Sequence, residues 1–258
     1  MIGRNVLITM LMLALLTATP APGMAKRKDA YLPLLKAGEF YINTRQYDRA
    51  IDNFKKCIEL NSLSDEAYKN LGYSYYKKKE YQKAIDSYKQ ALSLNADAKN
   101  VRYRLAMAYK ATGNIDDAVI QLENAIDQNP RDAESIFELG VIYGQKKLYS
   151  QAIEMFEKVI AINPNYSKAY YNLGVAYYAK KDFNKSQEYY IKAIEANKNN
   201  ANAHKNLAAI YVDRKQYVDA INHLKAYVNS APGASDVDFV EFQIKKLRSI
   251  IGDKYTLQ

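Results

Sequence analysis

The sequence predicts an all-α fold, a solenoid of stacked helical hairpins closed by a C-terminal helix. The chain of 258 residues repeats one pattern every 34 residues without insertions. Apolar positions within each repeat recur at helical spacing. Only 10 Gly and 6 Pro are present, too few for the many turns of a β fold. A composition of 48% hydrophobic and 25% charged residues excludes a disordered or low-complexity chain.

Six repeats account for most of the chain. Position 11 is Tyr in every repeat, position 8 is Gly or Ala, and position 24 is large and apolar. Positions 4, 7, 8 and 11 share one face of a first helix, and positions 20, 21, 24, 27 and 28 share one face of a second. A single hairpin cannot bury both apolar faces, so we expect the hairpins to stack. The predicted repeats are residues 31–64, 65–98, 99–132, 133–166, 167–200 and 201–234.

Two positions of the repeat predict local structure. Small residues at positions 8 and 20, such as Gly72 and Ala84, are expected to face each other and to let the two helices approach. Position 31 is Asn in five repeats, and Asn tolerates the left-handed conformation that ends many helices. These residues are Asn61, Asn95, Asn129, Asn163 and Asn197.

Residues 235–258 are predicted to form a capping helix and tail. Ser235 is a plausible N-cap, and Gly252 is expected to end the helix after Ile251. An apolar stripe would cover the last repeat while charged residues face solvent, as a terminal repeat requires. The stripe consists of Val237, Val240, Ile244, Leu247 and Ile251.

The N-terminus is typical of a secretory signal peptide over residues 1–25. Arg4 precedes the apolar run Val6 to Leu16, small residues follow, and we place cleavage after Ala25. Residues 26–30 would then be a basic linker. This pattern predicts an exported, periplasmic or secreted protein. The alternatives are an uncleaved membrane anchor and a buried N-terminal helix.

The 34-residue pattern over residues 31–234 resembles the tetratricopeptide repeat (TPR) family. Position 4, often Trp in that family, departs most at Arg102 and His204, and position 32 is Pro in only three repeats. The resemblance implies a right-handed α-solenoid whose concave surface is lined by positions 2, 5, 9 and 12 of each first helix. It also implies a non-enzymatic scaffold or adaptor that binds a peptide or helix of a partner protein.

Carried onto this sequence, the concave positions form an aromatic and aliphatic strip, with Asn or Arg at position 6 beside it. Continuous exposed apolar surface usually marks an interaction site, and Tyr suits such surfaces. We expect the partner in a cell-envelope assembly. The predicted partner-binding residues are Lys69, Asn70, Tyr73 and Tyr76; Tyr103, Arg104 and Met107; Phe137 and Val141; and Tyr171, Asn172, Val175 and Tyr178.

Other interpretations of this surface stay open. The rings could cover one another, or the chain's own terminus could fill the groove. A net charge of +9 admits an anionic polymer, a membrane surface or the cell wall as partner. The excess charge forms no long basic stripe, so we do not expect a specific nucleic-acid partner. Self-assembly into an oligomer is a further alternative. A carboxylate clamp is not predicted, because Leu35 and Glu39 stand where that clamp needs Lys and Asn.

Catalysis and cofactor binding are not predicted. One cysteine, Cys57, excludes a disulfide or a multi-thiolate zinc site within the chain. The two histidines, His204 and His223, lack metal-ligand spacing, and we expect His204 in the core. No phosphate loop or nucleophile elbow is present. We therefore expect no catalytic residues, no metal and no cofactor.

Overall fold

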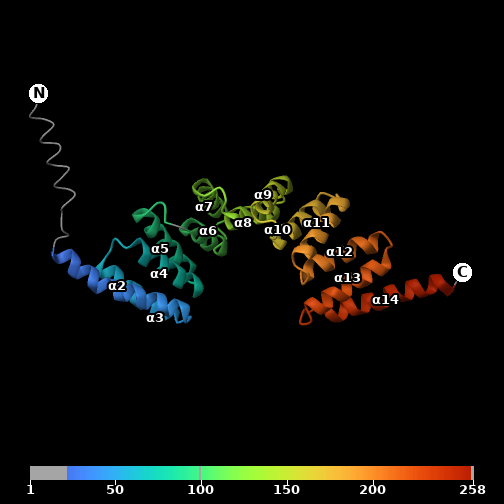
Figure 1. Ribbon diagram of the computed structural model, residues 1–258, viewed down its shortest axis with the longest axis horizontal. Coiled ribbons are helices and arrows are strands. Elements are labelled where there is room, and N and C mark those ends of the chain that lie inside the picture. The colour runs from blue at the N-terminus through green and yellow to red at the C-terminus, as the bar shows by residue number, and fades with distance from the viewer. Residues whose placement is uncertain (1–21, 99, 257–258) are drawn as a thin grey trace, which may run out of the picture. The chain divides into compact units, whose positions relative to one another are not determined.

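The computed structural model describes residues 22–98 and 100–256, which form helices joined by short turns with no strand among them (Figure 1). The fold is an all-α repeat solenoid, as the sequence predicts. The helices are α2 (Pro22–Asn43), α3 (Tyr47–Leu60), α4 (Asp65–Lys77), α5 (Tyr81–Leu94), α6 (Val101–Ala111), α7 (Ile115–Gln128), α8 (Ala133–Gln145), α9 (Tyr149–Ile162), α10 (Ser167–Ala179), α11 (Phe183–Ala196), α12 (Ala201–Asp213), α13 (Tyr217–Ser230) and α14 (Val237–Thr256).

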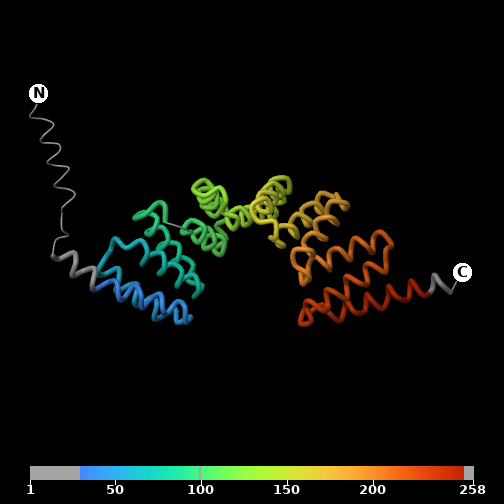
Figure 2. The backbone as a smooth tube through the Cα atoms, in the orientation of Figure 1, coloured from blue at the N-terminus to red at the C-terminus, as the bar shows by residue number. Residues whose placement is uncertain are grey.

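Two compact units divide the chain, and their boundary lies within α7. The N-terminal unit is Met1–Gln121 and the C-terminal unit is Leu122–Gln258. In the N-terminal unit, each helix from α2 to α6 packs on the next. The helices from α8 to α14 follow the same rule in the C-terminal unit, where Figure 2 traces α12, α13 and α14 as successive antiparallel passes. Each hairpin therefore buries its second face against the following one.

The predicted signal peptide falls largely on residues 1–21, which lie outside the described residues. Helix α2 begins at Pro22 and runs through residues 26–30, the predicted linker. Among the described helices, none combines the length and apolar character that a bilayer span requires.

The small residue at position 8 accommodates the side chain at position 24 of the same repeat. In the fifth repeat position 8 also faces position 20, as expected, because Ser186 Oγ donates a hydrogen bond to the backbone oxygen of Gly174 at 2.9 Å. A Cβ on Gly72 would lie 2.8 Å from the ring of Tyr88, and one on Gly38 would lie 2.5 Å from the ring of Phe54. Gly140 and Gly174 meet Phe156 and Tyr190 in the same way. A position-24 ring thus requires Gly at position 8. In the sixth repeat the pair is Ala208 with Leu224, a smaller side chain that leaves room for a Cβ.

Apart from Asn100, which directly precedes α6, the described left-handed residues lie inside the hairpins, and the expectation that Asn at position 31 adopts this conformation is wrong. Positive φ occurs at position 15, the turn between the two helices of a repeat. The described residues with positive φ are Arg45, Lys79, Lys147, Lys181, Lys215 and Gly113 at that position, together with Asn100.

Asn at position 31 has another role, visible at Asn163, where φ is −133°. Its Oδ1 accepts a hydrogen bond from the backbone N–H of Asn165 at 3.1 Å. The other four position-31 asparagines make the same bond to the residue two places on. Each is an Asx turn, in which the side chain replaces a backbone acceptor.

The capping helix is longer than predicted. Helix α14 begins at Val237 and continues through Gly252 to Thr256, so Gly252 does not end it and Ser235 is not its N-cap. Gly252 does not have the positive φ that terminates helices, so the helix passes through it. Val240, Ile244 and Leu247 are buried against α13, as the apolar stripe predicts.

Candidate functional site

In the N-terminal unit, the predicted residues of α4 and α6 come together around Tyr73. The guanidinium carbon of Arg104 lies 4.6 Å from the centre of the Tyr73 ring, and Lys77 Nζ lies 5.4 Å from it. Beneath them, burial raises the pKa of the Tyr88 phenol, and the nearby Arg104 opposes that rise. Tyr88 therefore stays neutral and contributes bulk and a polar tip. Tyr76 packs edge-on against Tyr81 at 5.4 Å.

The polar residues predicted beside this patch have partners within the chain. Asn70 Nδ2 donates a hydrogen bond to Glu39 Oε1 at 3.4 Å. Lys69 Nζ lies 3.6 Å from Glu66 Oε1. Tyr103 and Met107 are half-buried. This surface holds aromatic rings and cations, and it is less exposed than the sequence suggests.

In the C-terminal unit, the prediction that Phe137 presents an exposed ring is wrong. Phe137 is only 8% exposed. Its ring centre lies 5.6 Å from that of Phe156 and 5.2 Å from that of Tyr166. Val141 is half-buried against the same cluster. Phe137, at position 5, directly follows the buried Ile136 at position 4, and its large apolar side chain packs into the same core.

The predicted residues of α10 divide into two groups. Tyr171 packs on Tyr190, and Asn206 Nδ2 donates to both phenol oxygens at 3.4 and 3.2 Å. Asn172 Nδ2 donates to the backbone oxygen of Lys168 within its own helix. These side chains support the hairpin.

Val175 and Tyr178 form the second group, and both are exposed. Tyr178 packs edge-on against Phe183, which is exposed too. These three side chains leave an apolar patch open to a partner.

An apolar opening lies between α12 and α14, and most of the residues around it were not among those predicted from the sequence. It is a groove of about 720 Å³. Phe239 and Phe242 line it and are 59% and 63% exposed. The buried side chains of Leu224 and Leu247 also line it. The remaining lining residues are Lys205, Ala208, Ala209, Val212, Asp213, Tyr217, Asp236, Gln243, Lys246 and Ile250.

A small polar cluster joins α12 to the start of α14 beside this groove. Lys205 donates to Asp236, and the Tyr227 hydroxyl donates to the same carboxylate. The hydrogen bonds from Lys205 and Tyr227 hold the pKa of Asp236 below its ordinary value. These hydrogen bonds connect the beginning of α14 to both helices of the preceding hairpin, α12 and α13.

Two signals in the sequence point to this groove. Lys205, Ala209 and Val212 occupy positions 5, 9 and 12 of the sixth repeat, the positions already used for earlier repeats. Phe239 and Phe242 lie out of register with the buried stripe of α14, so the helix has to expose them.

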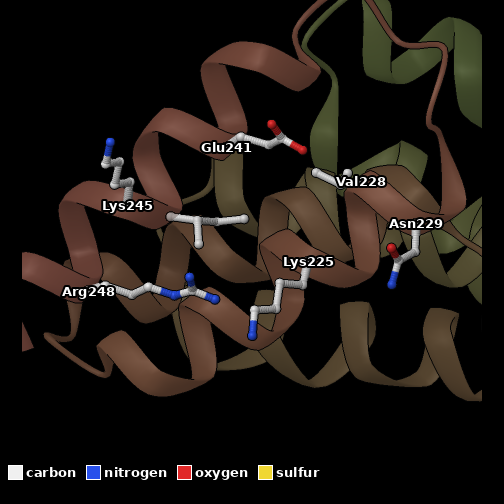
Figure 3. Close-up of a pocket in the computed structure, with 7 residues that line it drawn as sticks. Lys225, Val228, Asn229, Glu241, Lys245 and Arg248 are labelled. Atoms are coloured by element: carbon white, nitrogen blue, oxygen red, sulfur yellow. The ribbon is translucent and has the colours of Figure 1, made fainter.

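A second, polar concavity lies between α13 and α14, with a volume of about 500 Å³ (Figure 3). Lys225, Arg248, Lys245 and Glu241 line the concavity. In the view of Figure 3 the side chains of Arg248 and Lys225 extend toward each other, and Lys245 points away from them. Among the described residues, no ion pair or hydrogen bond engages these three cations. By contrast, Lys78, Lys158, Lys192 and Lys205 each pair with a carboxylate.

Chemistry-bearing clusters are sparse in the described part of the chain. Cys57 is buried, and burial raises the pKa of its thiol, so the reactive thiolate is disfavoured. Within residues 22–98 and 100–256, no three His, Cys, Asp or Glu side chains gather as metal ligands would.

Stacked two-helix repeats with an apolar groove on the first-helix side define a helical-repeat protein of the interaction class. Family models match over residues 26–131 (Tetratricopeptide repeat protein 21 C-terminal ARM domain), 145–181 (TPR repeat), 167–200 and 189–222 (both tetratricopeptide repeat). The chain belongs to the tetratricopeptide repeat family.

Solved structures share this fold. The crystal structure of MamA matches with 27% identity over 66% of this chain and 93% of that one, at a TM-score of 0.61. YrrB, described as a TPR protein with an unusual peptide-binding site, matches with 24% identity over 71% and 96%, at 0.60. PilF of Pseudomonas aeruginosa matches with 19% identity over 85% and 99%, at 0.70. The last two show the fold alone. No curated protein matches the chain.

Proposed function

We propose that this protein is a non-enzymatic scaffold that binds a segment of a partner protein in the groove between α12 and α14. The observation that carries the proposal is the exposure of Phe239 and Phe242 along one groove. Both rings are exposed to water in the free protein, so a partner that covers them would stabilise the complex by burying their apolar surface. YrrB, a protein of the same fold, is described as having a peptide-binding site, which supports a groove role in general.

The chemistry of the groove specifies the kind of segment. Its aromatic walls and buried leucine floor favour apolar or aromatic anchor side chains. Lys205, Asp213, Asp236 and Lys246 carry both signs of charge, so the groove does not select a strongly charged partner. The lining residues of α14 run from Phe239 to Ile250, about three helical turns. That length suits a short helix or an extended peptide.

The setting of this activity is part of the proposal. The apolar run Val6 to Leu16 and the small residues before Ala25 support export, and we place the partner in a cell-envelope assembly. Fractionation of the native host with an antibody against the repeats tests this placement. Recovery of the protein only from the cytoplasm would refute it.

A groove variant tests the binding proposal. In the full chain, Phe239 and Phe242 are both replaced with Ser, and a photoreactive residue at Val212 captures partners in the native host. The captured segment is identified by mass spectrometry, synthesised, and titrated against each variant. We expect the double replacement to weaken binding at least tenfold, because central aromatic anchors each contribute upward of about 1 kcal/mol.

Phe40→Ser is the matched control. Phe40 is 59% exposed, as Phe239 is, but it lies on α2 in the N-terminal unit. It should leave binding unchanged. Equal binding by the parent and the double variant would refute the groove proposal. Capture of a second copy of this chain, with sedimentation that depends on protein concentration, would replace it with self-assembly.

A second candidate is binding of an anionic group at the α13–α14 concavity. Lys225, Lys245 and Arg248 line this concavity without carboxylate partners among the described residues, and Glu241 is the one acidic residue of the lining. Vesicles with and without an anionic lipid test this candidate at several salt concentrations. Salt-sensitive binding that is lost in Lys225→Gln/Arg248→Gln supports it, because exposed charges are screened by salt. Binding insensitive to salt or to the variant refutes it.

A further inference from the structure

The chain has two histidines, and the fold brings them into contact. His204 lies on α12 and His223 on α13. Their Nδ1 atoms are 2.9 Å apart and their ring centres 5.2 Å apart. His204 is only 7% exposed and His223 is half-buried. Neither side chain takes part in the groove described above.

The surrounding atoms assign the protons of this pair. His204 Nε2 lies 3.0 Å from the backbone oxygen of Lys198. A carbonyl oxygen can only accept, so Nε2 carries the proton and Nδ1 of neutral His204 is an acceptor. The hydrogen bond between the rings then requires that His223 Nδ1 donates. The nitrogen left for an added proton is His223 Nε2.

We propose that the His204–His223 pair makes the packing of α12 on α13 sensitive to acid. One added proton on His223 preserves the bond between the rings, because His223 Nδ1 still donates. A second added proton would have to sit on His204 Nδ1, where it would face the N–H of His223 at 2.9 Å. The folded pair therefore holds at most one added proton, whereas the two histidines of the unfolded chain take up two.

The groups around the pair set the direction of its titration. On α13, the Asp219 carboxylate one turn before His223 favours the charged imidazole, but burial first and His204 second disfavour it. The net effect holds the pKa of His223 below its ordinary value of 6.5. On α12, the Tyr211 ring stacks on His223 at 5.4 Å.

The groups that the neighbouring helices place around Tyr211 and α13 are neutral, apolar or already paired. From α11, neutral Gln187 donates to the Tyr211 hydroxyl and also accepts from Arg214. Helix α14 contributes apolar side chains against α13. Asp236, which directly precedes α14, pairs with Lys205, and its pKa lies below its ordinary value of 3.8. Loss of that ion pair therefore occurs at lower pH than the histidine effect.

The sign follows from proton uptake. Because His223 binds its proton less tightly in the folded state, the stabilisation is complete above about pH 6.5 and is lost as the pH falls below that value. Once both histidines of the unfolded chain are charged, one proton is taken up on unfolding if folded His223 is charged and two if it is still neutral. The unfolding equilibrium constant then rises by between about tenfold and a hundredfold for each pH unit that the pH falls. One consequence rests on the groove proposal: acid would weaken the packing of α12, which forms one side of the groove.

The test uses the full chain without a polyhistidine tag. Urea unfolding is followed between pH 7.5 and 5.0 for the parent and for His204→Gln/His223→Gln, which removes every imidazole. Amide exchange of α12 and α13 is compared with that of α4 and α5, which contain no histidine. We expect the parent to lose stability with falling pH, faster exchange in α12 and α13 alone, and a flat profile for the double variant.

Nuclear magnetic resonance of the parent gives a readout that needs no variant. Long-range proton–nitrogen correlations should show the proton of His204 on Nε2 and that of His223 on Nδ1 at pH 7.5. Only one of the two rings should gain a proton while the fold persists. Two rings that titrate independently near 6.5 in the folded protein, or equal pH profiles for parent and double variant, would overturn the proposal. Neither outcome depends on partner binding.

Discussion

Replacing Gly38 with Ala tests the packing rule between positions 8 and 24. A Cβ on Gly38 would lie 2.5 Å from Cε1 and 2.6 Å from Cζ of Phe54. Phe54 is fully buried, so its ring has no solvent to move into. Helices α2 and α3 must therefore separate or the ring must leave its rotamer.

The expected magnitude follows from two opposing effects. At an unhindered helical site, Gly→Ala stabilises a protein by about 1 kcal/mol. Here ordinary contact begins near 3.4 Å, so the ring atoms must retreat by almost an ångström. Forcing an extra methyl group into a packed core costs about 1–3 kcal/mol, and a gap this short lies at the upper end. We expect a net loss of about 1–2 kcal/mol.

Urea unfolding of four proteins measures this effect: the parent, Gly38→Ala, Phe54→Leu and the double variant. Phe54→Leu alone should cost about 1 kcal/mol by leaving a cavity. Together the two changes reproduce the Ala208 and Leu224 pair of the sixth repeat, so they should be less damaging than their sum by about 1 kcal/mol or more. A stabilised Gly38→Ala variant, or additive effects, would refute the rule.

Three further predictions follow from the turns and the α12–α14 contact. Lys181→Gly, at a left-handed position, should stabilise the chain by about 0.5–1 kcal/mol, and Gly113→Lys should destabilise it by a similar amount in thermal unfolding. Asn163→Ala removes an Asx turn and should cost about 1 kcal/mol, with Asn165→Ala as the neutral neighbour; equal midpoints would contradict this. The pKa of Asp236 is lowered by Lys205, so its stabilisation holds above pH 3.8 and is lost as pH falls below it. Asp236→Asn should therefore flatten the acid limb of the unfolding profile, and an unchanged limb would count against the pair.

The fold was predictable because every repeat solves the same packing problem. Positions such as 7, 11 and 24 recur in phase, and a period of 34 with two helical faces admits few other arrangements. The reasons behind single positions were less predictable. Asn163 and Lys181 both lie in turns, but sequence alone assigned the left-handed conformation to the asparagine. The structure assigns it to the basic residue, since the side chain of Asn163 forms a turn that needs no positive φ.

The candidate site was predictable only in part. Tyr73 and Arg104 do come together, and Val175 and Tyr178 are exposed as expected. The exposure of Phe137 was predicted wrongly because a repeat position indicates which helix face a residue lies on, but not whether neighbouring rings bury its side chain. The α12–α14 groove was missed because its exposed rings, Phe239 and Phe242, lie on α14, beyond the last full repeat, where no repeated position indicates them.

Both proposed sites lie where the repeat pattern breaks. The regular positions are occupied by contacts between the two helices of a hairpin, as the Gly38–Phe54 and Ala208–Leu224 pairs illustrate, and a residue that holds the solenoid together is not free to meet a partner. Phe239 and Phe242 belong to a helix that follows its own stripe, which leaves them exposed. His204 departs from the family at position 4, and that departure creates the paired imidazoles. The C-terminal unit therefore contains both the proposed binding groove and the histidine pair proposed to respond to acid.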